Sequence, residues 1–294
     1  MEPHKLLPTL MLTMLILLAA LIWFYPSTGD FRLDNPFWNG LTTFTTKFKA
    51  STIESLNNLP STAKGTVLIL IPYSQLTEQE LEKLRSYVLK GGTLILLDDY
   101  GFGNQVLSNL GLEVRFKGSP LLDPLFNYKN KWLPKITDFP QTPLTGNIKS
   151  IVLNHATALC NTSESEVLAW SSRFSFLDLD GDSVWDPDEP TGPFPIAAYV
   201  KVGEGYVVAV ADPSIIINSM IVLGDNMAFM ENIVGLGGEK SKVIIDQSHL
   251  PIGPLEEAKE TIAETYTLAS SPIGTLSLIT LILALTLYPI WKKR

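Results

Sequence analysis

The sequence predicts an α/β protein with a doubly wound, mostly parallel sheet, flanked by a transmembrane helix at each end. Two observations carry this prediction. A strand–helix–strand pattern fills residues 65–97, and a run without charged residues lies near each end of the chain, over Leu6–Tyr25 and Pro272–Trp291. Each run is as long as the ~20 apolar residues that a helix needs to cross the hydrocarbon core of a bilayer.

The two terminal runs are expected to act as membrane anchors. We assign residues 1–25 to an N-terminal transmembrane anchor and residues 271–294 to a C-terminal transmembrane helix with a basic tail. Ile22–Tyr25 resembles an aromatic interfacial belt more than a signal-peptide cleavage site, although a cleaved signal peptide is the alternative. The basic residues at 5 and 292–294 are typical of cytoplasmic ends. We therefore expect a two-pass protein of the cell membrane, with both termini cytoplasmic and the main domain extracytoplasmic.

Composition excludes some classes of function. The formal net charge of -8 argues against a nucleic-acid partner, because phosphate binding needs a basic face. The single cysteine, Cys160, excludes an internal disulfide and a site built from several cysteines.

The strand–helix–strand unit is specified by local signals. Gly65–Ile71 is a short continuous apolar run, which is typical of a strand buried on both faces. Thr77 and Glu80 have the spacing of a capping box, which opens a helix. Gly91-Gly92 are expected to end this helix, because glycine readily adopts the left-handed backbone conformation of a helix C-terminus. Thr93–Leu97 is the next expected strand. A connection of this length predicts a parallel crossover.

Residues 26–254 are expected to form one domain around this unit. Residues 117–149 are rich in Pro, Asn and Lys, and we interpret them as an insertion. Residues 255–270 are expected to form a juxtamembrane helix. Further helices are expected at 104–110 and 225–234, and further strands at 112–116, 150–154, 166–170, 195–202, 206–211 and 243–245, with a hairpin turn at 203–205.

Several motifs together resemble an archaeal family, the membrane-anchored domain of unknown function 4350. They are Asn35–Gly40, Leu76–Glu80 with Gly91-Gly92, Asp98–Gly101, Gly192-Pro193, Asp212–Ser214 and Gly224–Asn226. The resemblance implies a flavodoxin-like sheet of the class I glutamine amidotransferase-like fold, and a tethered domain linked to envelope assembly. It brings no established activity.

The amidotransferase reaction is expected to be lost. It needs a nucleophilic cysteine on a sharp turn, with a base within hydrogen-bond reach. The turn after Thr93–Leu97 has the sequence Asp98–Gly103, without cysteine or serine, and Cys160 has no flanking glycine. We expect Cys160 to be a buried structural thiol.

An acidic segment at residues 178–189 has the spacing of a calcium loop. Such a loop takes oxygen ligands at positions one, three, five, nine and twelve and a backbone carbonyl at position seven. Ser183 replaces the glycine that is usual at position six. A structural Ca²⁺ ion is one interpretation, and an acidic hairpin tip without metal is the other. The ligands would be Asp178, Asp180, Asp182, Val184, Asp186 and Glu189.

A second group of acidic residues lies where strands end. Ligands of open α/β sheets bind outside the carboxyl ends of the strands. Catalytic candidates, if the protein is an enzyme, are Asp98, Asp99, Asp212 and Asp246. Ligand-binding candidates are Asp98, Asp99, Asp212, Ser214, Asn218 and Asn226. The alternative is that these residues cap helices and turns. His249 is expected in an exposed loop.

We therefore expect a binding or scaffold protein that assists envelope biogenesis or transport, with a membrane-protein or envelope partner. Two alternatives stay open. One is a hydrolase that uses the strand-end carboxylates on a glycan, peptide or nucleotide, and the other is a solute-capture domain for a transporter.

Overall fold

The structure is a computed structural model that describes residues 3–291. The chain forms two compact units, one from Met1–Gly29 and Ile252–Arg294 and the other from Asp30–Pro251. The first unit contains three helices, α1 (Pro3–Phe24), α6 (Pro254–Ser270) and α7 (Pro272–Trp291). Within it, the Glu256 carboxylate in the first turn of α6 accepts a hydrogen bond from the Ser27 hydroxyl at 2.5 Å and from the N–H groups of Thr28 and Gly29.

The prediction of two transmembrane helices is wrong. Within residues 3–291, none of the helices combines the length and the apolar character that crossing a membrane requires. The expectation rested on the length of the two apolar runs and on the aromatic and basic residues beside them. Hydroxyl side chains interrupt the runs, and those of Thr275 and Thr280 donate to backbone carbonyls.

The location derived from those helices is corrected with them. The two-pass arrangement, with cytoplasmic termini and an extracytoplasmic domain, loses its basis. Lys292, Lys293 and Arg294, on which the predicted orientation depended, lie outside the described residues.

The second unit is built on a seven-stranded mixed sheet in the order β1-β13-β2-β3-β12-β11-β9. The pairs from β1 to β12 are parallel, and β11 pairs antiparallel with both β12 and β9. The strands are β1 (Ser51–Ile53), β2 (Thr66–Leu70), β3 (Thr93–Leu97), β9 (Val167–Trp170), β11 (Pro195–Val202), β12 (Gly205–Val210) and β13 (Lys242–Asp246).

The predicted flavodoxin-like order is also wrong. That order places five parallel strands as 2-1-3-4-5 along the sheet. Here the last parallel strand in the chain, β13, lies between the first two, β1 and β2, so that the order is 1-5-2-3-4. The sheet is mixed as well, because the β11–β12 hairpin turns the chain back and adds antiparallel strands at one edge.

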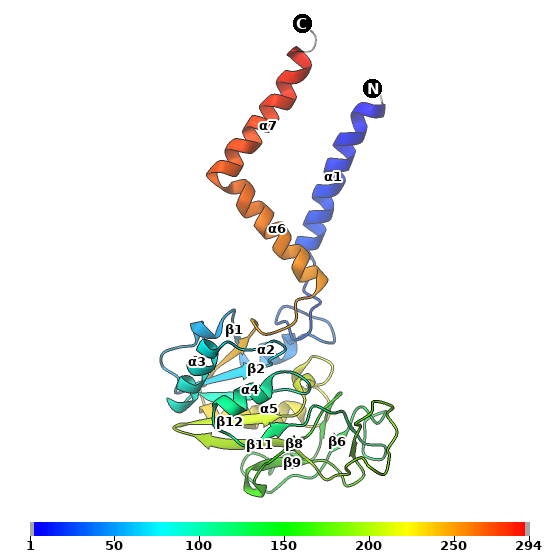
Figure 1. The fold of residues 1–294 in the computed structure, drawn as a ribbon, viewed down its shortest axis with the longest axis vertical. Helices are drawn as coiled ribbons and strands as arrows, with labels where there is room; N and C mark the ends of the chain where they lie inside the picture. The colour runs from blue at the N-terminus through cyan, green and yellow to red at the C-terminus, as the bar shows by residue number, and fades with distance from the viewer. Residues whose placement is uncertain (1–2, 292–294) are drawn as a thin grey trace. The chain divides into compact units, whose positions relative to one another are not determined.

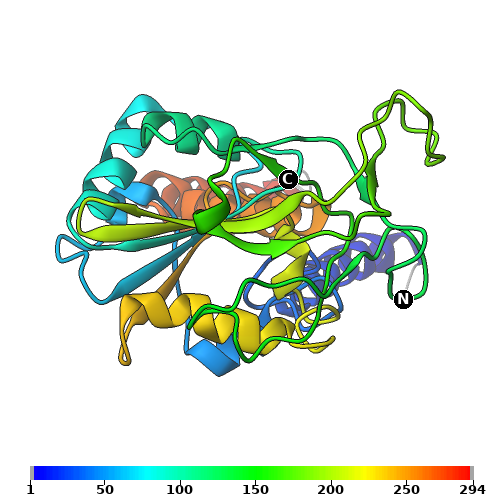
Figure 2. The same ribbon diagram turned by 90° about the horizontal axis from the view of Figure 1, so that it is seen from below.

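Helices cover both faces of the sheet (Figures 1 and 2), and a hydrophobic core lies on each face. Successive strand residues alternate between them, as the two-residue period of a strand requires: Val67 and Ile69 join one core, and Leu68 and Leu70 the other. The first core also takes in helices α2 (Thr42–Phe48) and α5 (Asn226–Val234). The second takes in α3 (Glu78–Leu89) and α4 (Gly103–Asn109).

Several local predictions are confirmed. Helix α3 begins with the expected capping box of Thr77 and Glu80, and β3 and β11 have the predicted limits. Apart from β9, the strands between residues 115 and 177 form short two-stranded ribbons. These are β4 (Arg115–Phe116) with β8 (Leu159–Cys160), β5 (Leu121–Leu122) with β10 (Phe176–Leu177), and β6 (Lys135–Ile136) with β7 (Ile151–Val152). Short 3-10 helices η1 to η4 span Leu56–Asn58, Glu164–Glu166, Pro213–Ile216 and Gly235–Gly237.

Candidate functional site

The carboxyl end of β3 is closed by the side chain of Asp98. Its Oδ1 accepts the N–H groups of Asp99 at 3.0 Å and Gly101 at 2.8 Å, and its Oδ2 accepts the N–H of Gly103 at 2.7 Å. A Cβ atom on Gly101 would lie 2.5 Å from the Pro72 carbonyl oxygen, so the turn needs glycine there. The segment Asp98–Gly103 is therefore a turn built around one carboxylate.

Burial dominates the electrostatics of Asp98. It raises the pKa of this carboxyl to about 6, although the three N–H donors oppose the shift. The adjacent Asp99 is also buried, and burial raises its pKa, while its Oδ1 accepts the Tyr100 N–H at 2.6 Å.

Asp212 follows β12 and belongs to the same cluster. It is fully buried, and it caps η3 by accepting the Ser214 N–H at 2.7 Å on Oδ1. Its Oδ2 accepts the Asn154 N–H at 2.8 Å. Burial, reinforced by the negative charge of Asp99, raises the pKa of Asp212 to about 8. The structure therefore brings Asp98, Asp99 and Asp212 together, with their acceptor oxygens directed at backbone donors.

The fourth strand-end residue, Asp246, forms a separate network. Its Oδ2 lies 2.8 Å from Nδ1 of His249, and its Oδ1 accepts the Ser248 hydroxyl at 2.6 Å. The His249 Nε2 lies 3.7 Å from Oε2 of Glu80, the capping-box residue of α3. Burial lowers the pKa of His249, but the hydrogen bond and charge of Asp246 and the charge of Glu80 outweigh it, and the net pKa is raised.

His249 is therefore not the exposed loop residue that we expected, because it is buried between two acidic groups. The spacing of Asp246 and His249, three residues apart after a strand, was the available signal for this contact.

The other ligand-binding candidates bond to backbone. Asn218 accepts the Thr43 N–H at 2.8 Å and donates to the Phe37 carbonyl at 2.7 Å, which fixes the start of α2. Asn226 is fully buried, accepts the Val152 N–H and donates to the Val152 carbonyl, both at 2.8 Å. These contacts favour structural roles for both residues.

Cys160 is half-buried, not buried as predicted, and it lies in β8 opposite Arg115. The nearest histidine in sequence, His155, stacks on Trp132 with ring centroids 4.6 Å apart.

The acidic loop at residues 178–189 brings three carboxylates together. Oxygen atoms of Asp178, Asp180 and Asp182 lie within 4.8 Å of one another. Asp178 is buried and accepts the N–H groups of Gly181 and Ser183, while Asp180 and Asp182 are exposed. Gly181 and Ser183 both have positive φ, 83° and 65°, which lets the loop turn inward twice. This convergence is what a hard cation such as Ca²⁺ requires.

The remaining predicted ligands are not part of this group of three carboxylates. Glu189 is buried, and its carboxylate accepts the N–H groups of Leu179 at 2.6 Å and Asp186 at 3.2 Å. Partial desolvation and the charges of neighbouring acidic residues raise the pKa of Asp186. The ligand roles of Asp186, Glu189 and the Val184 carbonyl stay predictions.

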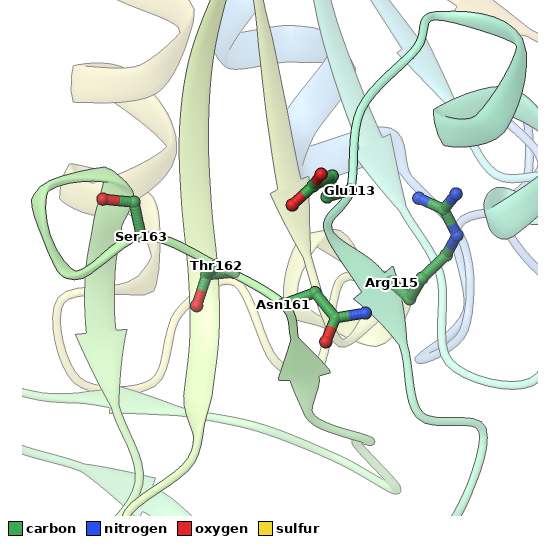
Figure 3. Close-up of a pocket in the computed structure, with 5 residues that line it drawn as sticks. All are labelled: Glu113, Arg115, Asn161, Thr162 and Ser163. Carbon is green, nitrogen blue, oxygen red and sulfur yellow. The ribbon is translucent and has the colours of Figure 1, made fainter.

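Two pockets are lined by residues other than the four strand-end aspartates. The first, of about 600 Å³, is open and polar, and Figure 3 shows its lining by Glu113 and Arg115 from one segment and by Asn161, Thr162 and Ser163 from another. The Arg115 guanidinium donates to the carbonyls of Leu112 and Val114. The second, of about 480 Å³, is lined by Phe126, Phe174 and polar residues. Sequence reasoning missed both, because the lining of each comes from segments far apart in the chain.

Comparisons with known proteins give a family and weak likenesses in fold. A family model described as domain of unknown function (DUF4350) matches residues 34–234. No curated protein matches the chain. The mmIFT52 N-terminal domain is similar at 14% identity and a TM-score of 0.45, over 57% of this chain and 76% of that one.

Two further solved structures resemble the chain at similar levels. A ThuA-like protein from Bacteroides uniformis shows 15% identity and a TM-score of 0.37, over 64% of this chain and 74% of that one. The β-galactosidase from Bacillus circulans shows 16% identity and a TM-score of 0.36, over 60% of this chain and 23% of that one.

Proposed function

The chain belongs to the DUF4350 family, and on that premise we propose that its α/β domain is a binding or scaffold module, with one structural calcium ion in the acidic loop. The observation that carries the proposal is the convergence of the Asp178, Asp180 and Asp182 carboxylates within 4.8 Å. Six acidic residues and no basic ones occupy residues 178–189, so a divalent cation would relieve their mutual repulsion.

The loop is placed where a cation would act on the fold. It begins directly after β10, and Asp178 donates its N–H to the Pro120 carbonyl beside β5. The Lys131 ammonium donates to the Ser183 carbonyl inside the loop. A bound ion would therefore stabilise the β5–β10 ribbon as well as the loop, with an affinity on the order of 10⁻⁴–10⁻³ M, the weak end of the range for calcium loops.

A binding function is favoured over the hydrolase alternative by the state of the strand-end carboxylates. An acid/base pair needs carboxyl groups that can reach the substrate. Asp98 accepts three backbone N–H groups and Asp212 accepts two, so their oxygens already hold the turn and the cap. The turn at Asp98–Gly103 contains no cysteine or serine, and loss of the amidotransferase reaction stays a prediction. The link to envelope assembly or transport stays a prediction.

The calcium proposal is tested by titration of the full chain with CaCl₂. Trp185 lies in the loop and is 49% exposed, so its fluorescence should change with saturation near millimolar calcium. Trp185→Phe identifies the signal, and calorimetry measures binding without it. Asp188→Asn, which alters an exposed loop carboxylate outside the predicted ligand set, should bind as the parent does. A calorimetric titration of the parent that shows no heat of binding up to about 10 mM calcium would contradict the proposed calcium site.

A further inference from the structure

The pocket of about 480 Å³ has the composition of a small-molecule binding site. Its apolar part is Phe126 and Phe174, whose side chains are 43% and 48% exposed, which is unusual for phenyl groups. Polar groups surround them, and ligand pockets typically combine an apolar lining with a few polar groups, within about 300–1,000 Å³. The full lining is Phe126, Thr137, Asp138, Ser171, Ser172, Arg173, Phe174 and Pro193.

The two phenyl rings form one platform. Their centroids are 6.0 Å apart and their planes differ by 11°. Rings at this separation and angle are in offset-stacked contact with each other. They leave no slot between them for a third ring, so a ligand can stack only on an outer face of the pair.

The platform is held in place by a buried carboxylate. Asp123 is 1% exposed, and its Oδ1 accepts the N–H groups of Leu125 at 3.0 Å and Phe126 at 2.7 Å. Its Oδ2 accepts the Ser172 hydroxyl at 2.6 Å, and the same hydroxyl accepts the Phe174 N–H at 3.1 Å. One side chain therefore positions the backbone of both phenylalanines, although they lie 48 residues apart.

The turn beneath the platform is packed tightly. A Cβ atom on Gly192 would lie 2.2 Å from the Ser172 carbonyl oxygen, so only glycine fits. The buried Ser171 hydroxyl accepts the Phe194 N–H at 2.8 Å and bonds to the Ser175 hydroxyl at 2.7 Å. Such support is typical of a preformed site, since it reduces the entropy lost on binding.

The polar rim offers both kinds of hydrogen-bonding group. The exposed Arg173 guanidinium supplies donors only, and the exposed Asp138 carboxylate supplies acceptors only. Their charges are opposite, so the pocket has no net preference for an anion or a cation. Its ligand should be neutral, with hydroxyl groups that can both donate and accept.

We propose that this pocket binds a neutral oligosaccharide, with the apolar face of one sugar ring stacked on an outer face of the Phe126–Phe174 pair and its hydroxyls bonded to Arg173 and Asp138. The proposal deepens the binding function proposed above and rests on it. A proline-rich peptide is the other class of ligand that aromatic grooves accept. It needs slots between aromatic side chains, and the stacked rings close that slot, whereas a sugar ring needs only a flat face.

The test uses the full chain and a panel of neutral trisaccharides: maltotriose, cellotriose, mannotriose and chitotriose. Saturation-transfer NMR detects contact, and calorimetry gives the affinity. At least one sugar should bind, and Phe126→Ala or Phe174→Ala should weaken it about 10-fold, which corresponds to the upper range of aromatic contacts. Arg173→Ala should weaken it as well. Leu125→Ala removes an exposed apolar neighbour outside the lining and should leave the affinity unchanged.

Asp123→Asn supplies a second variant that keeps the shape of the side chain. Loss of sugar binding, with the tryptophan bands of the near-ultraviolet circular dichroism spectrum unchanged, would support the positioning role of Asp123. Binding that is indifferent to Phe126→Ala and Phe174→Ala would overturn the assignment, as would a panel without any ligand. Binding of a proline-rich peptide in place of a sugar would overturn the assignment of the ligand but keep the proposed binding function. A calcium titration without any response would count against the proposed calcium site and not against the sugar pocket.

Discussion

The strand-end carboxylates and the acidic loop carry the same functional group in opposite environments. Asp98 and Asp212 are 4% and 0% exposed, and backbone N–H groups fill their oxygens. Asp180 and Asp182 are exposed and lie close to a third carboxylate, and each accepts only one backbone N–H group, from Asp182 and Val184 respectively. The comparison teaches that burial with backbone donors makes Asp98 and Asp212 part of the scaffold, whereas in the loop the buried Asp178 lies beside two aspartates whose exposure leaves them accessible to a cation.

The largest effect should come from removing the carboxylate that holds three donors. Asp98→Ala leaves the N–H groups of Asp99, Gly101 and Gly103 buried without their acceptor, which should lower the free energy of unfolding by about 3–4 kcal/mol. Urea denaturation measures it. Asp188→Ala, at an exposed loop position, should change it by less than about 0.5 kcal/mol. Equal effects at both positions would erase the distinction between the two regions.

The next effect concerns pH. The pKa of Asp212 is about 8 in the folded protein and about 3.9 in an unfolded chain. The folded state therefore keeps a proton that the unfolded state has lost, and this group makes stability fall as pH rises from about 4 to 8. Asp212→Asn cannot ionise, so its free energy of unfolding relative to the parent should increase by about 1.4 kcal/mol per pH unit, which is about 2.7 kcal/mol between pH 5 and pH 7.

Urea denaturation at several pH values checks this prediction. Asp225→Asn is a suitable control. Backbone donors from Lys149 and Ser150 lower the pKa of Asp225, so its contribution to the free energy of unfolding no longer changes with pH above the usual pKa of an aspartate. Parallel profiles for Asp212→Asn and the parent would show that the buried carboxyl does not titrate in this window.

The smallest effect belongs to the acidic loop. Calcium at ten times its dissociation constant should raise the free energy of unfolding by about 1.4 kcal/mol. The double substitution Asp180→Asn and Asp182→Asn should abolish this gain while changing stability without calcium by no more than about 0.5 kcal/mol. Thermal unfolding with and without calcium measures both, and a gain retained by the double variant would place any ion elsewhere.

The sequence predicted those parts of the fold that are encoded locally. The apolar runs of β2 and β3 and the capping box at Thr77 act over a few residues, so their elements have nearly the predicted limits. The acidic loop is local too, and its spacing was enough to anticipate the convergence of Asp178, Asp180 and Asp182.

Features that depend on distant segments were missed. Strand β1 has three half-exposed or exposed residues and no apolar run, so its parallel pairing with β13 has no local signature. The Phe126–Phe174 platform joins an irregular segment to a turn, through a carboxylate at residue 123. At the two ends of the chain, the apolar runs led to an expectation of membrane-spanning helices, and among the described residues no helix meets the requirements for crossing a membrane.

The place of β13 in the sheet has a consequence for biosynthesis. Because β13 lies between β1 and β2, the first two strands to leave the ribosome never pair with each other, and β1 has no partner strand until residues 242–246 arrive. Until then β2 presents one open edge, and the nascent chain must avoid pairing that edge with another molecule. Final closure of the parallel half is thus a late, long-range event, and any shortening of the chain ahead of Lys242 should yield an aggregation-prone product.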